Sequence, residues 1–245
     1  LYQYDYLASP AKIVPNAAAA MPEIADGGRT WTIRLRTGIR FADDPAFRGR
    51  PRELVAGDYV YSLKRWLDPT LKGGGEPALT DLIVGAREVV DAAKAPGARF
   101  DYDRPIAGLV AVDAHTLRIR TTAVDYTLLE RLASLPAMAV AREAIEDAGA
   151  DVMTRPVGTG PFVLKEWRKG SRIVLEANPH YRSFAFPTSS DPAHREVVAG
   201  MKGVKLPAIG RIEIAIIEEF LPELLSFEKG ELDYVGLGGQ VLGRV

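Results

Sequence analysis

The segment from Arg29 to Gly38, RTWTIRLRTG, alternates between apolar and polar residues. Trp31, Ile33 and Leu35 share one face of an extended chain, because successive side chains of a strand point to opposite sides. This period of two predicts a strand with one buried face. The same alternation recurs in TLRIR, in GPFVLKEW and SRIVLEANP, and in IGRIEIAII. The two middle segments are separated only by RKG, which predicts a β-hairpin.

Helical spacing occurs between these strands. In AGDYVYSLKRWLDP the apolar residues Tyr59, Leu63 and Trp66 stand at i, i+4 and i+7, and Asp58 lies near the favourable N-terminal end. Further helices are predicted at 86–95, 126–133 and 141–148, and in EEFLPELLSFEKGEL; DYVGL is predicted to be a short strand. The excursion 183–207 has no clear period, and its role stays open. Strands and helices that intermix in this way predict an α/β fold.

Three tryptophans accompany these elements. Trp31 and Trp167 lie on alternating strands, and Trp66 belongs to the apolar stripe of the helix. We therefore expect all three to be structural residues of a core.

Composition excludes several classes of function. The 245 residues have a formal charge of −1, which favours neither nucleic acid nor an anionic membrane as a partner. The sequence has no cysteine, so disulfides, thiolate metal sites and cysteine nucleophiles are excluded. No apolar run approaches the roughly 18 residues of a membrane span, so we expect no direct membrane insertion. The first residues, LYQYDYL, already look like a strand, and we expect an N-terminal segment to have been removed or to lie outside this chain.

Motifs for catalysis, metals and cofactors are missing. The stretch Gly158-Thr159-Gly160-Pro161 lacks the Lys-Ser or Lys-Thr and the following helix that a phosphate loop needs, and it lacks the third glycine of a dinucleotide site. His115, His180 and His194 have no metal-pair spacing, and we interpret them as solvated surface residues. The sequence contains no G-x-S-x-G motif. We therefore predict a protein that is not an enzyme, with no catalytic residue, metal site or cofactor.

Five segments in a fixed order resemble one known family. They are RTWTIRLRTGIRFADDPAF, LVAGDYVYSLKRWLDP, VAVDAHTLRIRT, PVGTGPFVLKEWRKGSRIVLEANPHYR and RIEIAIIEEFLPELLSFEKGELDYV. Together they are similar to the family 5 extracellular solute-binding proteins, the oligopeptide, dipeptide and nickel receptors of bacterial ABC importers. The resemblance runs from Leu1 to Val235, and the last ten residues fit it poorly.

This resemblance implies the α/β fold of type II periplasmic-binding proteins. A discontinuous first lobe would comprise 1–16 and 156–245, and a smaller α/β domain would be inserted at 17–155. The second lobe would be absent, so the chain looks like a fragment that binds its solute more weakly than the intact protein. Gly158-Thr159-Gly160-Pro161 would be the crossing point back into the first lobe, with glycine chosen for backbone angles that other residues avoid and Pro161 restricting φ at the start of the strand.

The resemblance also implies a function. A small solute, a peptide foremost, would bind between two lobes, and the periplasmic complex would deliver it to an inner-membrane ABC permease. The insertion-like ADDPAFRGRPREL departs from the family pattern, so nickel chelates and sugars remain open as solutes. The alternatives are a receptor for a signalling or chemotaxis system, or an α/β hydrolase. The ligand-binding candidates implied by the resemblance are Tyr2, Gly75, Glu76, Leu79, Met138, Tyr234, Gly236 and Leu237.

Overall fold

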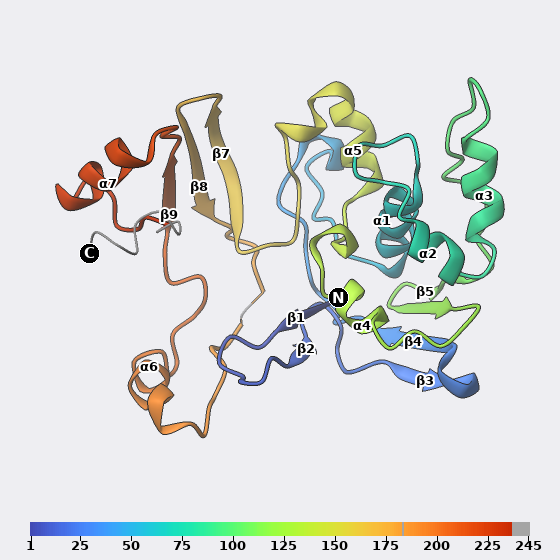
Figure 1. The fold of residues 1–245 in the computed structure, drawn as a ribbon, viewed down its shortest axis with the longest axis horizontal. Coiled ribbons are helices and arrows are strands. Elements are labelled where there is room, and N and C mark those ends of the chain that lie inside the picture. The colour runs from blue at the N-terminus through green and yellow to red at the C-terminus, as the bar shows by residue number, and fades with distance from the viewer. Residues whose placement is uncertain (183, 237–245) are drawn as a thin grey trace. The chain divides into compact units, whose positions relative to one another are not determined.

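The computed structural model describes residues 1–182 and 184–236 and shows a mixed α/β chain (Figure 1). Two compact units can be distinguished. The first contains residues 1–163 and 178–208, and the second contains residues 164–177 and the chain from Ile209 onward. Each unit is described by itself below.

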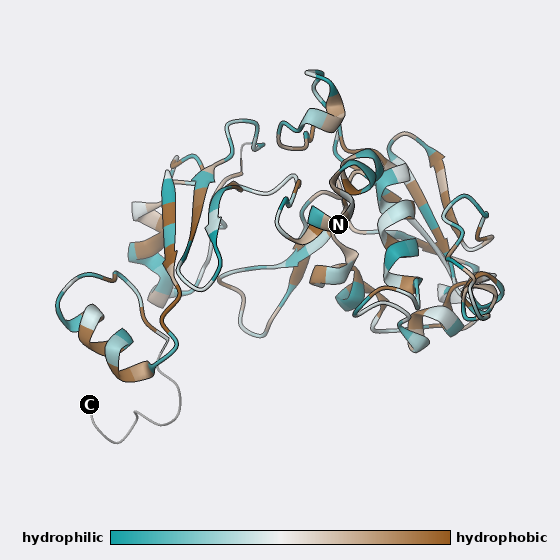
Figure 2. Ribbon diagram, turned by 90° about the horizontal axis from the view of Figure 1, so that it is seen from above, coloured by the Kyte–Doolittle hydropathy of each residue, from teal (hydrophilic) through white to brown (hydrophobic). Residues whose placement is uncertain are grey.

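A four-stranded antiparallel sheet forms the centre of the first unit, in the order β3-β4-β6-β5. Trp31 lies opposite Ile119 and Ile33 opposite Leu117, so the apolar residues of β4 and β6 share one face. All four are buried, which confirms the predicted alternation. Apolar and polar residues alternate visibly along the strands in Figure 2. The strands are β3 (Glu23–Ala25), β4 (Thr30–Arg34), β5 (Leu109–Asp113) and β6 (Thr116–Arg120).

Helix α1 (Ala56–Leu67) packs on β5 and β6 of this sheet. Its predicted stripe is confirmed: Tyr59 and Leu63 are buried, and Trp66 packs against the core from a partly buried position. The carboxylate of Asp58 accepts a hydrogen bond from the backbone N–H of Val55 across 2.8 Å, which satisfies a free donor at the start of the helix. The other helices of this unit are α2 (Pro77–Leu82), α3 (Ala86–Ala93), α4 (Leu128–Leu132), α5 (Arg142–Ala148) and α6 (Arg195–Gly200), and its 3₁₀ turns are η1 (Asp26–Gly28), η2 (Pro45–Phe47), η3 (Leu135–Ala137), η4 (Gly149–Met153) and η5 (Pro192–His194).

The N-terminal residues form a separate hairpin of β1 (Tyr2–Tyr4) and β2 (Ile13–Pro15), in which Tyr4 pairs with Ile13. This hairpin contacts the segment that follows residue 178. The guanidinium of Arg182 donates to the side chain of Asn16, and the rings of Tyr6 and Phe186 stack with centroids 6.4 Å apart. The predicted domain boundaries at 16/17 and 155/156 stay a prediction.

The stretch from Gly158 to Pro161 is held by hydrogen bonds. Its four consecutive carbonyl oxygens accept from the backbone N–H of Ala42, from Arg182, and from the side-chain and backbone N–H groups of Asn178, across 2.8–3.3 Å. Neither of its glycines has a positive φ, and an added Cβ would clash with nothing. The expectation that these glycines serve unusual backbone angles is therefore wrong, because neither adopts the left-handed conformation that favours glycine.

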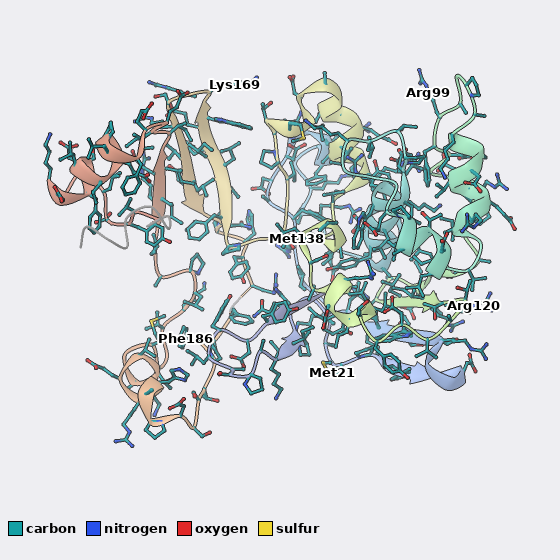
Figure 3. All side chains as sticks on the ribbon, in the orientation of Figure 1. Met21, Arg99, Arg120, Met138, Lys169 and Phe186 are labelled. Atoms are coloured by element: carbon teal, nitrogen blue, oxygen red, sulfur yellow. The ribbon has the colours of Figure 1, made fainter. Side chains whose placement is uncertain are left out.

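The second unit has a three-stranded sheet in the order β7-β8-β9, and helix α7 (Phe220–Glu228) follows it. The strands are β7 (Phe162–Arg168), β8 (Arg172–Ala177) and β9 (Arg211–Ala215). The predicted hairpin is confirmed, with Lys169 in its turn (Figure 3).

Two predictions for this unit are wrong. The segment 233–236 forms no strand, because no strand of the described chain pairs with its backbone. Trp167 is 40% exposed and so is not a core residue, since it lies one residue before the end of β7, beside the hairpin turn.

Within residues 1–182 and 184–236, no helix has the length and apolar character that would let it cross a bilayer.

Candidate functional site

A hollow of about 270 Å³ lies at the C-terminal end of α1. Ser62, Arg65 and Trp66 reach it together because residues three and four apart lie on the same side of a helix. The loop after the helix supplies a second wall, and the chain around η3 supplies a third. The full lining is Ser62, Arg65, Trp66, Leu71, Lys72, Gly73, Gly74, Leu135, Pro136, Met138 and Val140.

Three consecutive glycines bend the loop back over the helix end. Gly73 and Gly75 have φ values of 81° and 74°, in the left-handed region that other residues rarely adopt. A Cβ on Gly74 would lie 2.1 Å from the carbonyl oxygen of Asp68, so no larger residue fits. The backbone N–H of Gly75 donates to the carbonyl of Trp66 across 3.0 Å. The glycine-rich sequence is therefore required by this close approach.

A buried serine joins the other wall to α1. The hydroxyl of Ser62 donates to the carbonyl of Asp58 across 2.7 Å and accepts from the backbone N–H of Val140 across 2.9 Å. This bond fixes the segment that contains Met138, which is labelled in Figure 3. Met138 is 58% exposed. The apolar wall of the hollow is thus held in place while its surface stays accessible.

An ion cluster stiffens the start of α1. Arg52 donates to both carboxylate oxygens of Asp58, at 2.6 and 3.0 Å, and to Glu143 of α5 at 2.6 Å. Burial raises the pKa of Asp58, and the Arg52 guanidinium and the Val55 N–H oppose that rise. Through these two ion pairs Arg52 links α1 to α5, the helix that follows the Met138 segment.

A second hollow, of about 540 Å³, lies between the tip of the N-terminal hairpin and the segment 188–191. Asp5 and Lys12 are on one side, and Ser189 and Asp191 on the other. Several of these polar groups bond within their own loops: Asp5 accepts from the N–H of Leu7, and the carboxylate of Asp191 accepts from a following backbone N–H. Few of the polar groups that line this hollow are therefore left without a hydrogen-bond partner for a ligand to use.

The structure brings only some of the predicted ligand residues together. Met138 lines the smaller hollow, and Gly75 lies in the glycine loop beside it. Glu76 follows in that loop, with its carboxylate 3.9 Å from Arg131. Leu79 is only 1% exposed and belongs to the core.

The remaining predicted residues lie elsewhere. Tyr2 is buried in the N-terminal hairpin, with its hydroxyl 3.4 Å from the carbonyl of Ala20. In the second unit Tyr234 is 83% exposed, Gly236 follows it, and Leu237 lies outside the described residues. The smaller hollow also contains Arg65 and Lys72, which the sequence analysis did not single out. The sequence did contain a signal for this hollow: Ser62, Arg65 and Trp66 have the spacing of one helix face, and the glycine loop follows them directly.

The three histidines make hydrogen bonds at the surface. His115 lies 3.2 Å from Glu53, His180 lies 2.9 Å from Asp43, and His194 lies 2.9 Å from the hydroxyl of Ser189. In the part of the chain that the structure describes, no cluster of three or more acidic or histidine side chains is placed to hold a metal ion.

The fold is that of part of a type II periplasmic-binding protein. The substrate-binding domain of an oligopeptide ABC transporter from Bacillus anthracis superposes with a TM-score of 0.70 at 20% identity, over 100% of this chain and 40% of that chain. This likeness establishes the architecture, with this chain covering a minor part of the solved protein.

The model of the bacterial extracellular solute-binding proteins, family 5 Middle, matches residues 12–241. The chain belongs to this family. It is 33% identical to Protein XP55 of Streptomyces lividans over 74% of this chain and 29% of that protein. It is 27% identical to Di/tripeptide-binding protein 1 of Pseudomonas aeruginosa over 69% of this chain and 30% of that protein. The chain thus spans about a third of the length of these relatives.

Proposed function

We propose that this chain belongs to the substrate-binding component of a bacterial ABC importer, with a peptide or similar small solute as ligand. Family membership supports the class, and the relative named for di- and tripeptides supports the ligand. The observation that carries the proposal for this chain is the hollow at the end of α1, a prebuilt recess with an exposed apolar wall. A solute held there and covered by further protein would lose its contact with water.

We also propose a cellular location for the complex and boundaries for the inserted domain. The complex would work in the periplasm and release its solute to an inner-membrane permease. Residues 17–155 would form the inserted domain; every strand of the sheet β3-β4-β6-β5 and all helices from α1 to α5 lie within these limits. Residues 17–155 produced alone should then give a dispersed amide NMR spectrum, and a collapsed spectrum would refute the domain limits.

Binding without turnover is the decisive property. Calorimetric titration with a set of di- and tripeptides should show saturable binding, and chromatography of the mixture should show intact peptide. A partner lobe that closes over the solute would add contacts and so strengthen the affinity, because a ligand shifts a protein to the closed state only as far as it binds that state more tightly. Release of cleaved product would instead indicate a hydrolase, and the absence of binding to every peptide would reject the peptide assignment.

A matched pair of methionine variants locates the ligand. Met138→Gln removes an apolar contact in the hollow and should weaken peptide binding about fivefold, the equivalent of roughly 1 kcal/mol. Met153→Gln changes an exposed methionine outside the hollow and should leave affinity unchanged. Equal effects of the two substitutions would place the ligand elsewhere.

A further inference from the structure

The smaller hollow has a positive lining. Arg65 and Lys72 both line it, and none of its eleven lining residues is acidic. Throughout residues 1–182 and 184–236, no carboxylate lies within ion-pair distance of either side chain. Arg65 lies over the ring of Tyr61, 6.0 Å from its centroid, a contact that leaves its charge without an anion.

This situation differs from that of most partly buried arginines of the same unit, although Arg182 also lacks a carboxylate and donates to Thr159 and Asn16 instead. Arg52 is paired with Asp58 and Glu143, Arg131 with Asp125, and Arg155 with Asp44. A guanidinium that is partly withdrawn from water gains most from a carboxylate, because charge-assisted bonds strengthen as water is excluded. Arg65 is also partly buried and faces a recess without such a partner.

The position of the two cations has a competing explanation. Positive side chains at a helix C-terminus interact favourably with the helix dipole. The carbonyls of Arg65 and Trp66 already accept hydrogen bonds from the backbone N–H groups of Asp68 and Gly75, so two of the carbonyls at the end of α1 have backbone donors. The dipole also gives no reason for the exposed apolar residues that line the same hollow.

The lining of the hollow combines apolar residues with the two cations. Trp66, Leu135 and Met138 are apolar, and Leu135 and Met138 are largely exposed. A volume of about 270 Å³ equals that of roughly nine water molecules, enough for one amino-acid-sized group. An occupant that matches both kinds of residue has an apolar body and an anionic end.

We propose that the hollow binds a carboxylate-bearing apolar group, with the carboxylate on Arg65 and Lys72 and the apolar body on Trp66, Leu135 and Met138. The inference deepens the proposed function, on which it rests for the idea that this hollow is a ligand site. It narrows the solute class to amphipathic molecules with a carboxylate, of which the C-terminal residue of a peptide is one source and a free organic acid another.

The test uses small probes that fill the hollow by themselves. N-acetylphenylalanine and its neutral amide have the same apolar body, and only the first has a carboxylate. We expect the acid to bind about tenfold more tightly, as monitored by amide NMR shifts in residues 62–74 and 135–140. The preference should decrease in high salt, since screening weakens exposed charge pairs.

Charge-removing variants connect the preference to the two cations. Arg65→Gln and Lys72→Gln should each reduce the acid-over-amide preference several-fold. Arg99→Gln, a change of the same type at an exposed arginine in the loop after α3 (Figure 3), should leave it unchanged. A role of Arg65 in stability alone would change the unfolding midpoint and leave the preference intact.

Four results overturn the inference: equal binding of acid and amide, shifts that map outside the hollow, an unchanged preference in both hollow variants, or binding of neither probe. The proposed function is judged separately by the peptide titrations. Peptides that bind without a preference for a free carboxylate would leave the importer assignment standing and remove only this inference. The matched comparison of free and C-terminally amidated peptides distinguishes a peptide end from a free organic acid.

Discussion

The side-chain amide of Asn178 donates to the carbonyl oxygen of Gly160 across 2.8 Å, and its backbone N–H donates to Pro161 across the same distance. Asn178 follows β8 directly, and Gly160 precedes β7. Asn178 is buried and its two acceptors are partly buried, so water has limited access to these bonds. One asparagine therefore closes the base of the β7-β8 hairpin.

We expect Asn178→Ala to lower the free energy of unfolding by about 1–3 kcal/mol, since it leaves the partly buried carbonyl of Gly160 without its donor. Urea unfolding monitored by circular dichroism measures the change. Thr188→Ala, at an exposed position, should remain within about 0.5 kcal/mol of the parent protein. An Asn178→Ala protein as stable as this control would show that the bond contributes nothing.

Gly74→Ala should destabilise the loop beside α1, because its Cβ would lie 2.1 Å from the Asp68 carbonyl oxygen. We expect a loss of more than about 1 kcal/mol and shifted amide resonances around the hollow. Gly57→Ala is the matched control: this glycine is in α1, a Cβ there would make only an ordinary contact with the Val55 side chain at 3.9 Å, and alanine should stabilise by about 0.5–1 kcal/mol. Effects of the same sign at both positions would contradict the loop geometry.

The tryptophans should differ in their contributions to stability. Trp31 is 7% exposed, and its indole N–H donates to the carbonyl of Gly28 across 3.0 Å, so Trp31→Ala should cost about 3–5 kcal/mol. Trp167→Ala should cost clearly less, because that ring is already partly in solvent. Thermal and urea unfolding of both variants measure the difference. Similar losses would mean that Trp167 is buried in solution.

Glu53 should make stability depend on acid pH. Its carboxylate accepts from the backbone N–H of Gly38 at 2.6 Å and lies 3.2 Å from His115. The Gly38 bond foremost, and then His115, lower the pKa of Glu53 below its ordinary 4.5. A carboxyl group with a lowered folded-state pKa stabilises above its unfolded pKa, and this contribution is lost as the pH falls through the folded value.

Glu53→Gln should therefore reduce stability near neutral pH and flatten its decline below about pH 4.5. Urea midpoints of both proteins across that range measure the difference, and an NMR titration of the Glu53 carboxyl gives its pKa directly. Parallel pH profiles of parent and variant would show that the contact with Gly38 does not persist in solution.

The local pattern of apolar and polar residues was sufficient to predict most of the strands and helices. The alternation around Trp31 and the helical stripe of Tyr59 and Leu63 both predicted structure correctly, because such periods depend on neighbours within a few residues. DYVGL was predicted as a strand, and its described residues 233–236 form none, since a strand also requires a partner that local sequence does not specify. The short helices α2 and α6 escaped prediction because they offer hardly two turns of periodicity.

The sequence by itself determined the α/β class, the main strands and helices, and membership of the family 5 solute-binding proteins, because periodicity and motif order are properties of the chain. Only the tertiary structure decided which residues share the hollow. Arg65, Lys72 and Met138 meet there because the glycine loop folds back on α1 and the Ser62 hydroxyl holds Val140, 78 residues further along the chain. Contacts at such separation depend on how packed elements meet, and no local pattern encodes that geometry.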